Sequence, residues 1–368
     1  MKQTNPGEVV KIEEFWKPKK PTREEEGGGG GRVRVVTWNI ERGYQIEGII
    51  REMKDVIDAD VMCIQEVDIG CERSRGVDCL REIASKLGMN CCFVSEFNEE
   101  WSPDRSKRDQ GGGVHGNAIF SRYPMRDVRV IRHSEQPVKW EVEGKKIGEP
   151  RTGERFAIRS DIEIPGWKNP LRIWCAHLEV FCGIKSRISQ FSDILRDSTG
   201  GGERGEGGEG TSTSPKQQQV HQIIAGDLNT MAHSIARLSR WYCRDSMRFY
   251  TIGQSEPMFW MRNVLQAKIS RRTIANPETG GKDEIEINES LRGWGFPESV
   301  CRACVNPGFE EVFGEVDRDI TLSNHCGLFN AKLDWIMCRG VFAVERNIGN
   351  HSFELSDHKW ISADVKPF

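Results

Sequence analysis

A chain of 368 residues, of which 37% are hydrophobic, can hold one large domain or two ordinary ones. Its formal net charge of −3 excludes a whole-molecule attraction to nucleic acid or to an anionic membrane, but it does not exclude a local basic patch. No run approaches the roughly 18 apolar residues of a membrane span, which argues against a transmembrane segment.

The positions of the twelve cysteines indicate in which cellular compartment the protein resides. Most lie inside apolar runs, where a free thiol behaves as a small hydrophobic side chain, and the first residues lack the apolar core of a secretory signal. We therefore expect free thiols in an intracellular protein, cytoplasmic or nuclear. We also expect a monomer. Cys301 and Cys304 form a CxxC pair without a second pair at zinc-finger spacing, which argues against a metal or redox role.

Three segments differ from the rest in composition. Residues 1–31 end in a glutamate and glycine run and predict a disordered leader. Residues 198–219 are rich in glycine, serine and glutamate and predict a mobile surface insertion. Residues 231–300 predict a second, partly helical insertion. Because motifs of matching character stand on both sides of the insertions, residues 32–368 are expected to form a single domain.

The first pattern after the leader is a strand–helix–strand unit. Residues 33–40 (VRVVTWNI) are apolar and β-branched and predict a buried strand that closes with Asn39. Apolar residues at helical spacing over residues 46–57 predict a helix, and residues 60–67 (DVMCIQEV) predict a second strand with Glu66 at its end. Parallel strands joined by a helix place both of these strand ends on the same edge of a sheet.

Further elements precede the glycine-rich insertion. The predicted elements are a helix, a half-buried strand of an antiparallel meander, a strand ending near His177, and a third helix, at residues 78–87, 156–164, 171–178 and 184–195. A glycine-rich loop at residues 111–124 leads into a short strand. This loop lacks the Lys-Ser/Thr ending of a P-loop, which excludes nucleotide binding of that type. Two of its residues, His115 and Asn117, are candidates for facing a pocket.

The most informative stretch is residues 220–230 (VHQIIAGDLNT). Its apolar run predicts a buried strand that breaks at Gly226, where the backbone turns without steric cost. Asp227 and Asn229 follow two positions apart, and such residues project to the same side of an extended chain. A carboxylate and a carboxamide are thus expected together at a strand end. The alternative is that both only form the hydrogen bonds of a local turn.

The C-terminal part of the chain adds two motifs. Residues 331–338 (AKLDWIMC) predict a strand that carries Asp334. A Ser-Asp-His sequence that contains Asp357 and His358 stands directly before a last strand at residues 360–365. These polar residues belong to the same candidate group as those above, because they too flank buried strands.

Taken in order, TWNI, QEV, HL, GDLNT with KLDW, and SDH resemble the motifs of the endonuclease/exonuclease/phosphatase superfamily, which includes pancreatic-type deoxyribonuclease, sphingomyelinases and inositol-polyphosphate 5-phosphatases. The resemblance runs from Val33 to Val365. It implies an α/β (α+β) fold, namely a four-layered sandwich of two packed mixed β-sheets flanked by helices. It also implies a metal-dependent phosphoric ester hydrolase.

The chemistry of such a reaction suits the residues singled out. Hydrolysis of a phosphate ester needs a metal that offsets charge, an oriented water, and groups that stabilise the phosphate oxygens. Glu66 is a hard oxygen ligand suited to Mg²⁺, with Mn²⁺ as the alternative ion, and Asn39 could complete or orient that site. The resemblance implies that Asp357 is a further metal-associated carboxylate. The alternatives are a surface carboxylate at Glu66 and a structural Asp357-His358 pair.

The catalytic roles come from the resemblance. Asp227 and Asn229 resemble the pair that orients or deprotonates the attacking water. His358 resembles the histidine that contacts the scissile phosphate, and Asp334 resembles the carboxylate that fixes its tautomer and favours its protonated form. At the position of His177 the abasic-site repair branch has an asparagine, so the histidine favours the deoxyribonuclease, sphingomyelinase and 5-phosphatase branches. A structural histidine is the alternative.

These residues predict a Mg²⁺-dependent phosphodiesterase of nuclease type. The alternatives are a sphingomyelinase-like or inositol-phosphate phosphatase activity, or a catalytically silent binding module. A nucleic-acid substrate predicts aromatic and basic side chains along a groove, unless they form a solvated helix face, and the candidates are Trp241, Arg240, Arg244, Arg271 and Arg272. A phospholipid substrate predicts an apolar lip, for which residues 257–261 (PMFWM) are the candidate if they do not form a core helix.

Overall fold

The computed structural model describes residues 4–16, 31–200, 221–231, 234–250, 254–275, 281–314, 320–324 and 329–368. Two of the expected segments lie largely outside these described residues: positions 17–30 of the leader and positions 201–219 of the glycine-rich insertion.

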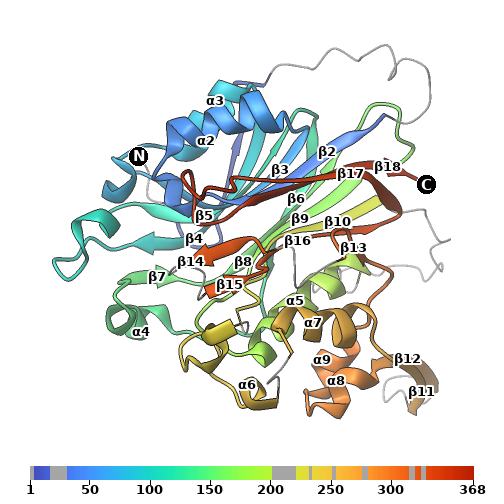
Figure 1. The fold of residues 1–368 in the computed structure, drawn as a ribbon. Coiled ribbons are helices and arrows are strands. Elements are labelled where there is room, and N and C mark those ends of the chain that lie inside the picture. The colour runs from blue at the N-terminus through green and yellow to red at the C-terminus, as the bar shows by residue number, and fades with distance from the viewer. Residues whose placement is uncertain are drawn as a thin grey trace.

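Two mixed β-sheets pack face to face (Figure 1). Among the described residues the first sheet has the order β1–β4–β5–β3–β2–β18–β17, with β7 paired to β4, and the second has the order β13–β16–β10–β9–β8–β6. The β2–β3 and β9–β10 ladders are parallel, whereas the described ladders beside them are antiparallel. The first sheet consists of β1 (Val9–Ile12), β2 (Val33–Asn39), β3 (Val61–Ile69), β4 (Asn90–Glu99), β5 (Val114–Ser121), β7 (Arg151–Gly153), β17 (Val341–Gly349) and β18 (Trp360–Pro367). The second consists of β6 (Met125–Arg132), β8 (Phe156–Ile162), β9 (Leu171–His177), β10 (His221–Asp227), β13 (Glu310–Glu311) and β16 (Asp334–Arg339).

The space between the sheets is an apolar layer over most of its extent. Val35 and Ile119 of the first sheet pack in one cluster with Ile158, Ile173 and Ile223 of the second, and all five side chains are fully buried. Each such side chain contributes roughly 1.5–3 kcal/mol when it leaves water. This burial on both sheets explains why their central strands read as continuous apolar runs.

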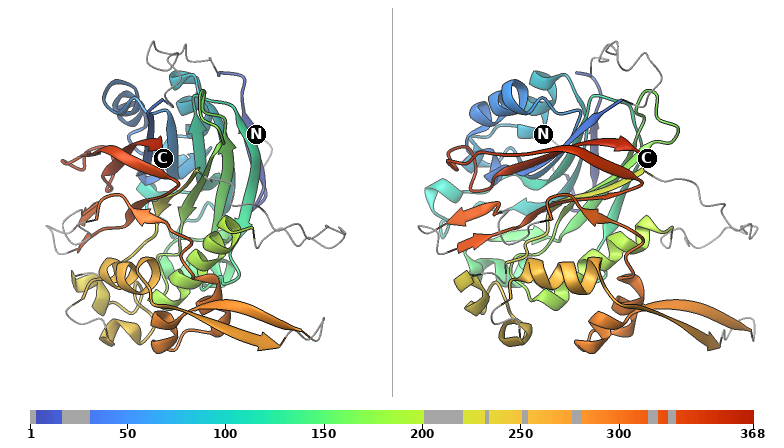
Figure 2. Two further views of the ribbon diagram at one scale, coloured as in Figure 1. Left: turned by 90° about the vertical axis from the view of Figure 1, so that its right-hand side faces the viewer. Right: turned by 45° about the vertical axis from the view of Figure 1, so that its right-hand side comes forward.

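Helices cover the outer face of each sheet and complete four layers (Figures 1 and 2). On the first sheet lie α2 (Ile46–Glu52), which continues into a π-helical turn at Met53–Ile57, and α3 (Cys79–Leu87). On the second lie α5 (Ile184–Ser198), α7 (Glu256–Trp260), α8 (Glu289–Gly293) and α9 (Glu298–Ala303). The short helices α4 (Trp140–Ile147) and α6 (Met247–Tyr250) lie near one end of the sandwich. The expected four-layered sandwich with two mixed sheets is confirmed.

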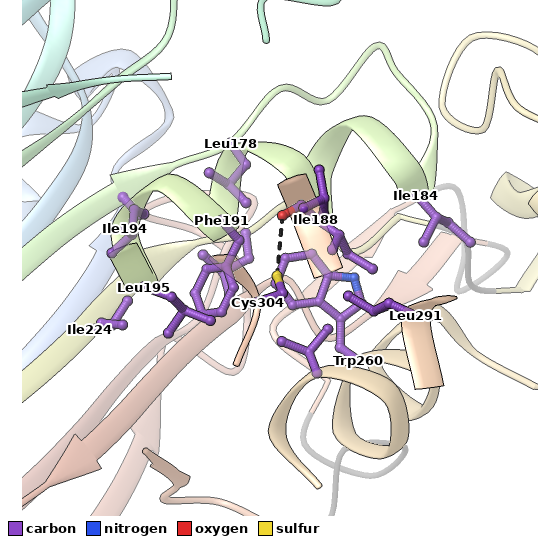
Figure 3. Close-up of a cluster of buried hydrophobic side chains, with 14 of the residues drawn as sticks. Leu178, Ile184, Ile188, Phe191, Ile194, Leu195, Ile224, Trp260, Leu291 and Cys304 are labelled. Carbon is purple, nitrogen blue, oxygen red and sulfur yellow. Dashed lines mark hydrogen bonds between the residues drawn. The ribbon is translucent and has the colours of Figure 1, made fainter. Parts of the chain in front are cut away.

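Residues 257–261 pack in the hydrophobic core on the outer face of the second sheet. Phe191 of α5 packs against Trp260 of α7 with ring centroids 5.1 Å apart, and Phe259 is equally buried (Figure 3). Residues 257–260 therefore belong to a core helix, which the sequence favours over an exposed apolar lip. Cys301 of α9 and Cys304, which directly follows this helix, are buried free thiols in the same cluster. The other described cysteines are also buried free thiols.

The expected disordered leader is wrong for residues 4–16. Val9, Val10 and Ile12 form β1, which pairs antiparallel with β4 from Val9 opposite Val94 to Ile12 opposite Cys91. Trp16 then donates from Nε1 to the carbonyl oxygen of Arg122 over 2.9 Å. A four-residue strand at a sheet edge has too short an apolar pattern to stand out within a polar segment.

The insertion at residues 231–300 contains a β-hairpin besides its helices. β11 (Ile269–Ala275) pairs with β12 (Lys282–Asn288), and this hairpin projects from the helical layer (Figure 2). A second hairpin, β14 (Leu322–Asn324) with β15 (Phe329–Ala331), precedes β16, so the strand expected at residues 331–338 begins at Asp334. The strand expected to be half-buried at residues 156–164 is almost wholly buried, because it lies inside the second sheet.

Of the helices in the described part of the chain, none combines the length and the apolar character needed to cross a bilayer.

Candidate active site

The ends of the central strands converge at one edge of the sandwich. Asp227 closes β10 and stands in register between His177 of β9 and Asp334 of β16. From the first sheet come Asn39 at the end of β2 and Glu66 within β3. A cavity of about 210 Å³ lies at this edge, and its lining includes the predicted residues Asn39, Glu66, His115, His177, Asp227, Asn229, Asp357 and His358. Asp334 lies behind His358.

Two backbone features aim these side chains. The ladder between β3 and β5 shifts register between Ile64 and Val67, and Glu66 in this bulge has a φ of 59°. Non-glycine residues rarely adopt positive φ, and bulges often re-aim a side chain beside a functional site. At Gly226 the strand does not break, contrary to expectation. The chain stays in β10, and a Cβ there would lie 2.0 Å from the carbonyl oxygen of Ala176. Glycine is therefore required for the close approach of β9.

The turn expected as an alternative after Asp227 is present, but it occupies only one carboxylate oxygen. The backbone NH of Asn229, whose φ is 49°, donates to Asp227 Oδ1 over 2.8 Å. Oδ2 remains directed at the cavity residues and accepts from Asn39 Nδ2 over 3.1 Å. The local turn thus fixes the carboxylate for contacts made by its other oxygen.

The first of two imidazoles near Asp227 belongs to His358. Its Nδ1 lies 2.8 Å from Asp334 Oδ2, and its Nε2 lies 3.8 Å from Asp227 Oδ2. Burial alone would lower the pKa of His358, but the carboxylates of Asp334 and Asp227 outweigh it and raise that pKa well above the ordinary value. His358 is therefore a buried imidazolium at neutral pH.

The second imidazole belongs to His177, and its surroundings are the opposite. Its Nδ1 lies 3.1 Å from Arg155 Nη1, and its Nε2 lies 3.6 Å from Asp227 Oδ2. A guanidinium only donates hydrogen bonds, so Nδ1 must accept and the single ring proton resides on Nε2. Burial and the Arg155 cation lower the pKa of His177 well below the ordinary value, so this imidazole is neutral.

Asp227 lies between the two rings. The pKa of its carboxyl is raised to about 7, because burial and the Asp334 carboxylate raise it by more than the His358 cation lowers it. A carboxyl with a pKa near neutrality suits proton transfer at physiological pH.

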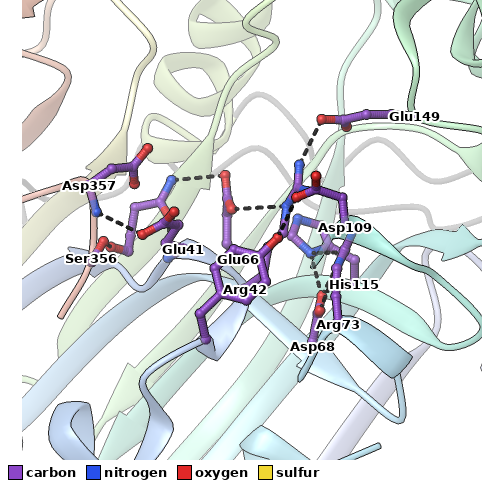
Figure 4. Close-up of polar contacts among 12 residues, drawn as sticks. Glu41, Arg42, Glu66, Asp68, Arg73, Asp109, His115, Glu149, Ser356 and Asp357 are labelled. Atoms are coloured by element: carbon purple, nitrogen blue, oxygen red, sulfur yellow. Dashed lines mark hydrogen bonds and ion pairs between the residues drawn. The ribbon is translucent and has the colours of Figure 1, made fainter. Parts of the chain in front are cut away.

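The glutamate side of the cavity is a network of charges (Figure 4). Asn39 Nδ2 donates to Glu66 Oε1 over 3.2 Å, and Arg42 Nε lies 3.8 Å from Glu66 Oε2. Arg42 also binds Glu149 over 2.7 Å. Burial alone would raise the pKa of Glu66, but Arg42 and its neighbours lower it, so Glu66 is ionised.

Two carboxylates, Glu66 and Asp357, line this side of the cavity, and Glu41 lies beside them. Burial, together with the mutual repulsion of these carboxyls, raises the pKa of Glu41 to about 7 and also raises that of Asp357. Asn39 turns its amide nitrogen, not its oxygen, to Glu66, which suits an orienting role. A second group of possible ligands, Asp227, Asp334 and His358, has ligand atoms within 4.8 Å of one another. There Asp334 Oδ1 is buried without a hydrogen-bond partner among the described residues.

Some candidates lie elsewhere. Asn117 is fully buried and does not line the cavity, unlike His115. Arg271 and Arg272 lie on the β11–β12 hairpin, where they pair with Glu286 and Glu289 and are absent from the cavity lining. Trp241 is half exposed next to Tyr242, which does line the cavity.

Several cavity residues were not predicted from the sequence, namely Arg42, Glu149, Arg151, Arg155, Val180, Phe181, Met231, Tyr242, Leu322 and Leu333. Arg42 and Val180 to Phe181 directly follow predicted motifs, so adjacency could have identified them. Arg155 sits just before a predicted strand, but nothing in its local pattern distinguishes it from a surface arginine.

A buried Asp between two imidazoles, beside an acidic cluster at the edge of a two-sheet sandwich, defines the site class of a phosphoester hydrolase with a deoxyribonuclease-like fold. The chain belongs to the endonuclease/exonuclease/phosphatase family, whose model matches residues 36–358. Membership supports hydrolysis of phosphate esters, and this family generally depends on a divalent metal.

Solved structures share the fold at low sequence identity. The structure of ANGEL2, described as a 2′,3′-cyclic phosphatase in complex with adenosine-2′,3′-vanadate, matches with a TM-score of 0.51 and 13% identity over 91% of this chain and 95% of that chain. A family protein from Leptotrichia buccalis C-1013-b matches with a TM-score of 0.50 and 12% identity over 91% and 99% of the two chains. No curated protein matches the chain significantly in sequence.

Proposed function

We propose that this protein is a phosphodiesterase of nuclease type that depends on Mg²⁺, with Mn²⁺ as a substitute. One observation carries the proposal: Asp227 Oδ2 faces the Nε2 atoms of two imidazoles, at 3.8 Å for His358 and 3.6 Å for His177. One imidazole has a carboxylate on its far nitrogen and the other has a guanidinium. A base, a cation and a neutral donor thus meet in one cavity.

Each residue then has a distinct task. Asp227, with Asn229 beside it, accepts the proton of the attacking water. The bond from phosphorus to the leaving oxygen breaks, and the imidazolium of His358 supplies the proton that this oxygen needs, with Asp334 holding the ring. His177 donates from Nε2 to a phosphate oxygen. Such proton transfers typically contribute about 10²–10⁴-fold each.

Glu66 and Asp357 are the residues that would hold the metal, with Asn39 orienting Glu66. When bound, the ion supplies Lewis-acid stabilisation of charge on the phosphate oxygens. The ionised state of Glu66 and the acidic crowding with Glu41 and Asp357 fit Mg²⁺, which prefers one or two carboxylates and water.

The test uses bis-p-nitrophenyl phosphate with Mg²⁺ and with chelator. Wild type is expected to release p-nitrophenolate with Mg²⁺ only, and His358→Ala should lose about 10³-fold in kcat/KM. His351→Ala is the matched control, because His351 is exposed and outside the cavity. Turnover that chelator does not reduce, or equal rates for both variants, would contradict the proposal.

The proposal includes a monomer, located in the cytoplasm or nucleus, with a single domain over residues 32–368 to which β1 adds an edge strand. Its support is the family match over residues 36–358 and the eleven free, buried cysteines of the described chain, which suit a reducing compartment. Size-exclusion chromatography with light scattering would test the monomer.

A further inference from the structure

The cavity has two unlike walls. One carries the charged and catalytic groups described above. The other is formed by six side chains that are apolar or aromatic, namely Val180, Phe181, Met231, Tyr242, Leu322 and Leu333. The group that accompanies the phosphate therefore meets a wall with almost no hydrogen-bonding capacity.

Two rings of this wall are stacked and held in place. Phe181 lies nearly parallel to Tyr242, with ring centroids 5.6 Å apart and planes 22° apart. Behind it, Trp140 contacts Phe181 edge-on at 5.9 Å and Phe97 at 5.5 Å. Trp140 is held in turn by Glu179, which accepts from its Nε1 over 3.0 Å and lies 3.9 Å from Arg155. Phe181 is thus a rigid, half-buried ring that faces the cavity.

Building on the proposed function, we infer that the Phe181–Tyr242 pair is a stacking platform for a nucleobase, so that the substrate is a nucleotide ester. A planar base adds a further ring to such a stack, and every base has a π-face that allows this. Polar edges of the base remain free for Arg and Glu side chains of the opposite wall.

The same wall disfavours the other two substrate classes. An inositol ring carries hydroxyls on all sides, and an apolar wall would leave them unpaired at a cost. The cavity of about 210 Å³ is smaller than the pockets of roughly 300–1,000 Å³ that hold drug-sized ligands, so it leaves no room for the acyl chains of a phospholipid.

The experiment compares two phosphodiesters with the same leaving group. Thymidine 5′-(p-nitrophenyl phosphate) carries a base, whereas methyl p-nitrophenyl phosphate does not. We expect wild type to favour the thymidine ester in kcat/KM by about tenfold or more, the size expected for one base–aromatic stack. Phe181→Leu should abolish this preference by raising KM for the thymidine ester, whereas Phe181→Tyr should retain it.

Phe342→Leu, an exposed phenylalanine on β17 outside the cavity, is the matched control and should behave as wild type. Circular dichroism checks that each variant is folded. The same preference in wild type and Phe181→Leu would overturn the inference, and so would faster hydrolysis of an inositol phosphate or of dispersed phospholipid.

A binding measurement separates this inference from the proposed function. In calorimetry, thymidine 5′-monophosphate should bind more tightly than ribose 5-phosphate, and Phe181→Leu should remove the difference. If neither ester turns over but this difference is found, the proposed function fails and the base platform stands. If both esters turn over and the difference is absent, hydrolysis stands and the base platform fails.

Discussion

The two histidines near Asp227 are equally buried and equally close to its Oδ2, yet the structure gives them opposite charge. His358 has the carboxylate of Asp334 at its far nitrogen, and His177 has the guanidinium of Arg155 there. Burial lowers the pKa of both rings, so burial does not distinguish them. The group that holds Nδ1 decides whether a buried imidazole is a cation or a neutral donor.

The contrast extends into the network behind each ring. Among the residues that the structure describes, no guanidinium pairs with Asp334, whose backbone NH donates to Thr321 Oγ1 over 3.1 Å. Arg155 is fixed by Glu96 Oε2 at 2.8 Å and lies 3.9 Å from Glu179. The carboxylate of Asp334 therefore has the imidazolium of His358 as its counter-charge. The guanidinium of Arg155 is instead balanced by Glu96 and Glu179, so it needs no charge on His177.

Removing the carboxylate behind His358 should have the largest effect. In Asp334→Asn the imidazole of His358 loses the larger of the carboxylate contributions that raise its pKa, so less of it is protonated at pH 7. We expect kcat for bis-p-nitrophenyl phosphate to fall by about 10³-fold with KM little changed, within the range for a lost proton-transfer group. Asp161→Asn, at a partly buried carboxylate that pairs with Arg172 outside the cavity, serves as control. Retained activity at pH 7 would mean that the His358 cation is not required.

Removing the guanidinium that contacts His177 should lower the stability of the protein and change the pKa of this histidine. In Arg155→Met the buried carboxylates of Glu96 and Glu179 lose their cation, which should lower the free energy of unfolding by roughly 3 kcal/mol. The pKa of His177 should rise towards its ordinary value, because a cation beside it is gone.

Nitrogen-15 NMR of the imidazoles reports both the tautomer and the titration of His177. In wild type Nδ1 of His177 should be unprotonated across pH 5–8, and Arg155→Lys should restore this state in part. A protonated Nδ1 in wild type would contradict the assignment.

A third buried histidine, His133, tests how close a carboxylate must lie to raise the pKa of a buried imidazole. His133 Nδ1 lies 3.9 Å from Asp193 Oδ2, beyond hydrogen-bond distance, and burial lowers its pKa from 6.5 to about 4. The unfolded chain therefore binds a proton between these values and the folded chain does not. Stability is complete above pH 6.5 and falls as the pH drops towards 4. Between pH 7.5 and pH 5 the loss should be roughly 2 kcal/mol.

His133→Gln removes this titration. The difference in unfolding free energy between wild type and His133→Gln, measured with urea, should change by that amount over the same pH range. A difference that does not depend on pH would mean that His133 has the same pKa in the folded and the unfolded protein.

The sequence predicted the strand-borne part of the site because strand ends carry local signals. Asn39, His177 and Asp227 each end a strand, and parallel connections bring such ends to one edge. Glu66 was also expected at a strand end, but β3 continues to Ile69 and Glu66 lies in its bulge. The family resemblance supplied the roles of Asp334 and His358. The fold class followed from the same runs.

What the sequence did not reveal depends on contacts between distant segments. Arg155 is 22 residues from His177, and its role arises only when β8 and β9 pair. β4 was not predicted although it supplies Glu96 and Glu99, because its apolar run is interrupted by these buried charges. Gly226 was taken for a turn because its neighbour across the ladder, Ala176, is invisible in a single stretch of sequence.

The ion pair between Arg271 and Glu286 is exposed to solvent, so it contrasts with the buried charges around the two histidines. Nε of Arg271 lies 3.1 Å from Glu286 Oε1, and the arginine side chain is 73% exposed. Solvent-exposed ion pairs contribute about 0.2–1 kcal/mol, so Arg271→Ala should lower the free energy of unfolding by less than about 1 kcal/mol. Turnover of thymidine 5′-(p-nitrophenyl phosphate) should stay unchanged, because the hairpin does not line the cavity. Glu286→Gln should give the same small effect if the pair alone is responsible. A clear loss of turnover in Arg271→Ala would instead extend the substrate site from the cavity to this hairpin, as the basic pattern of the sequence first suggested.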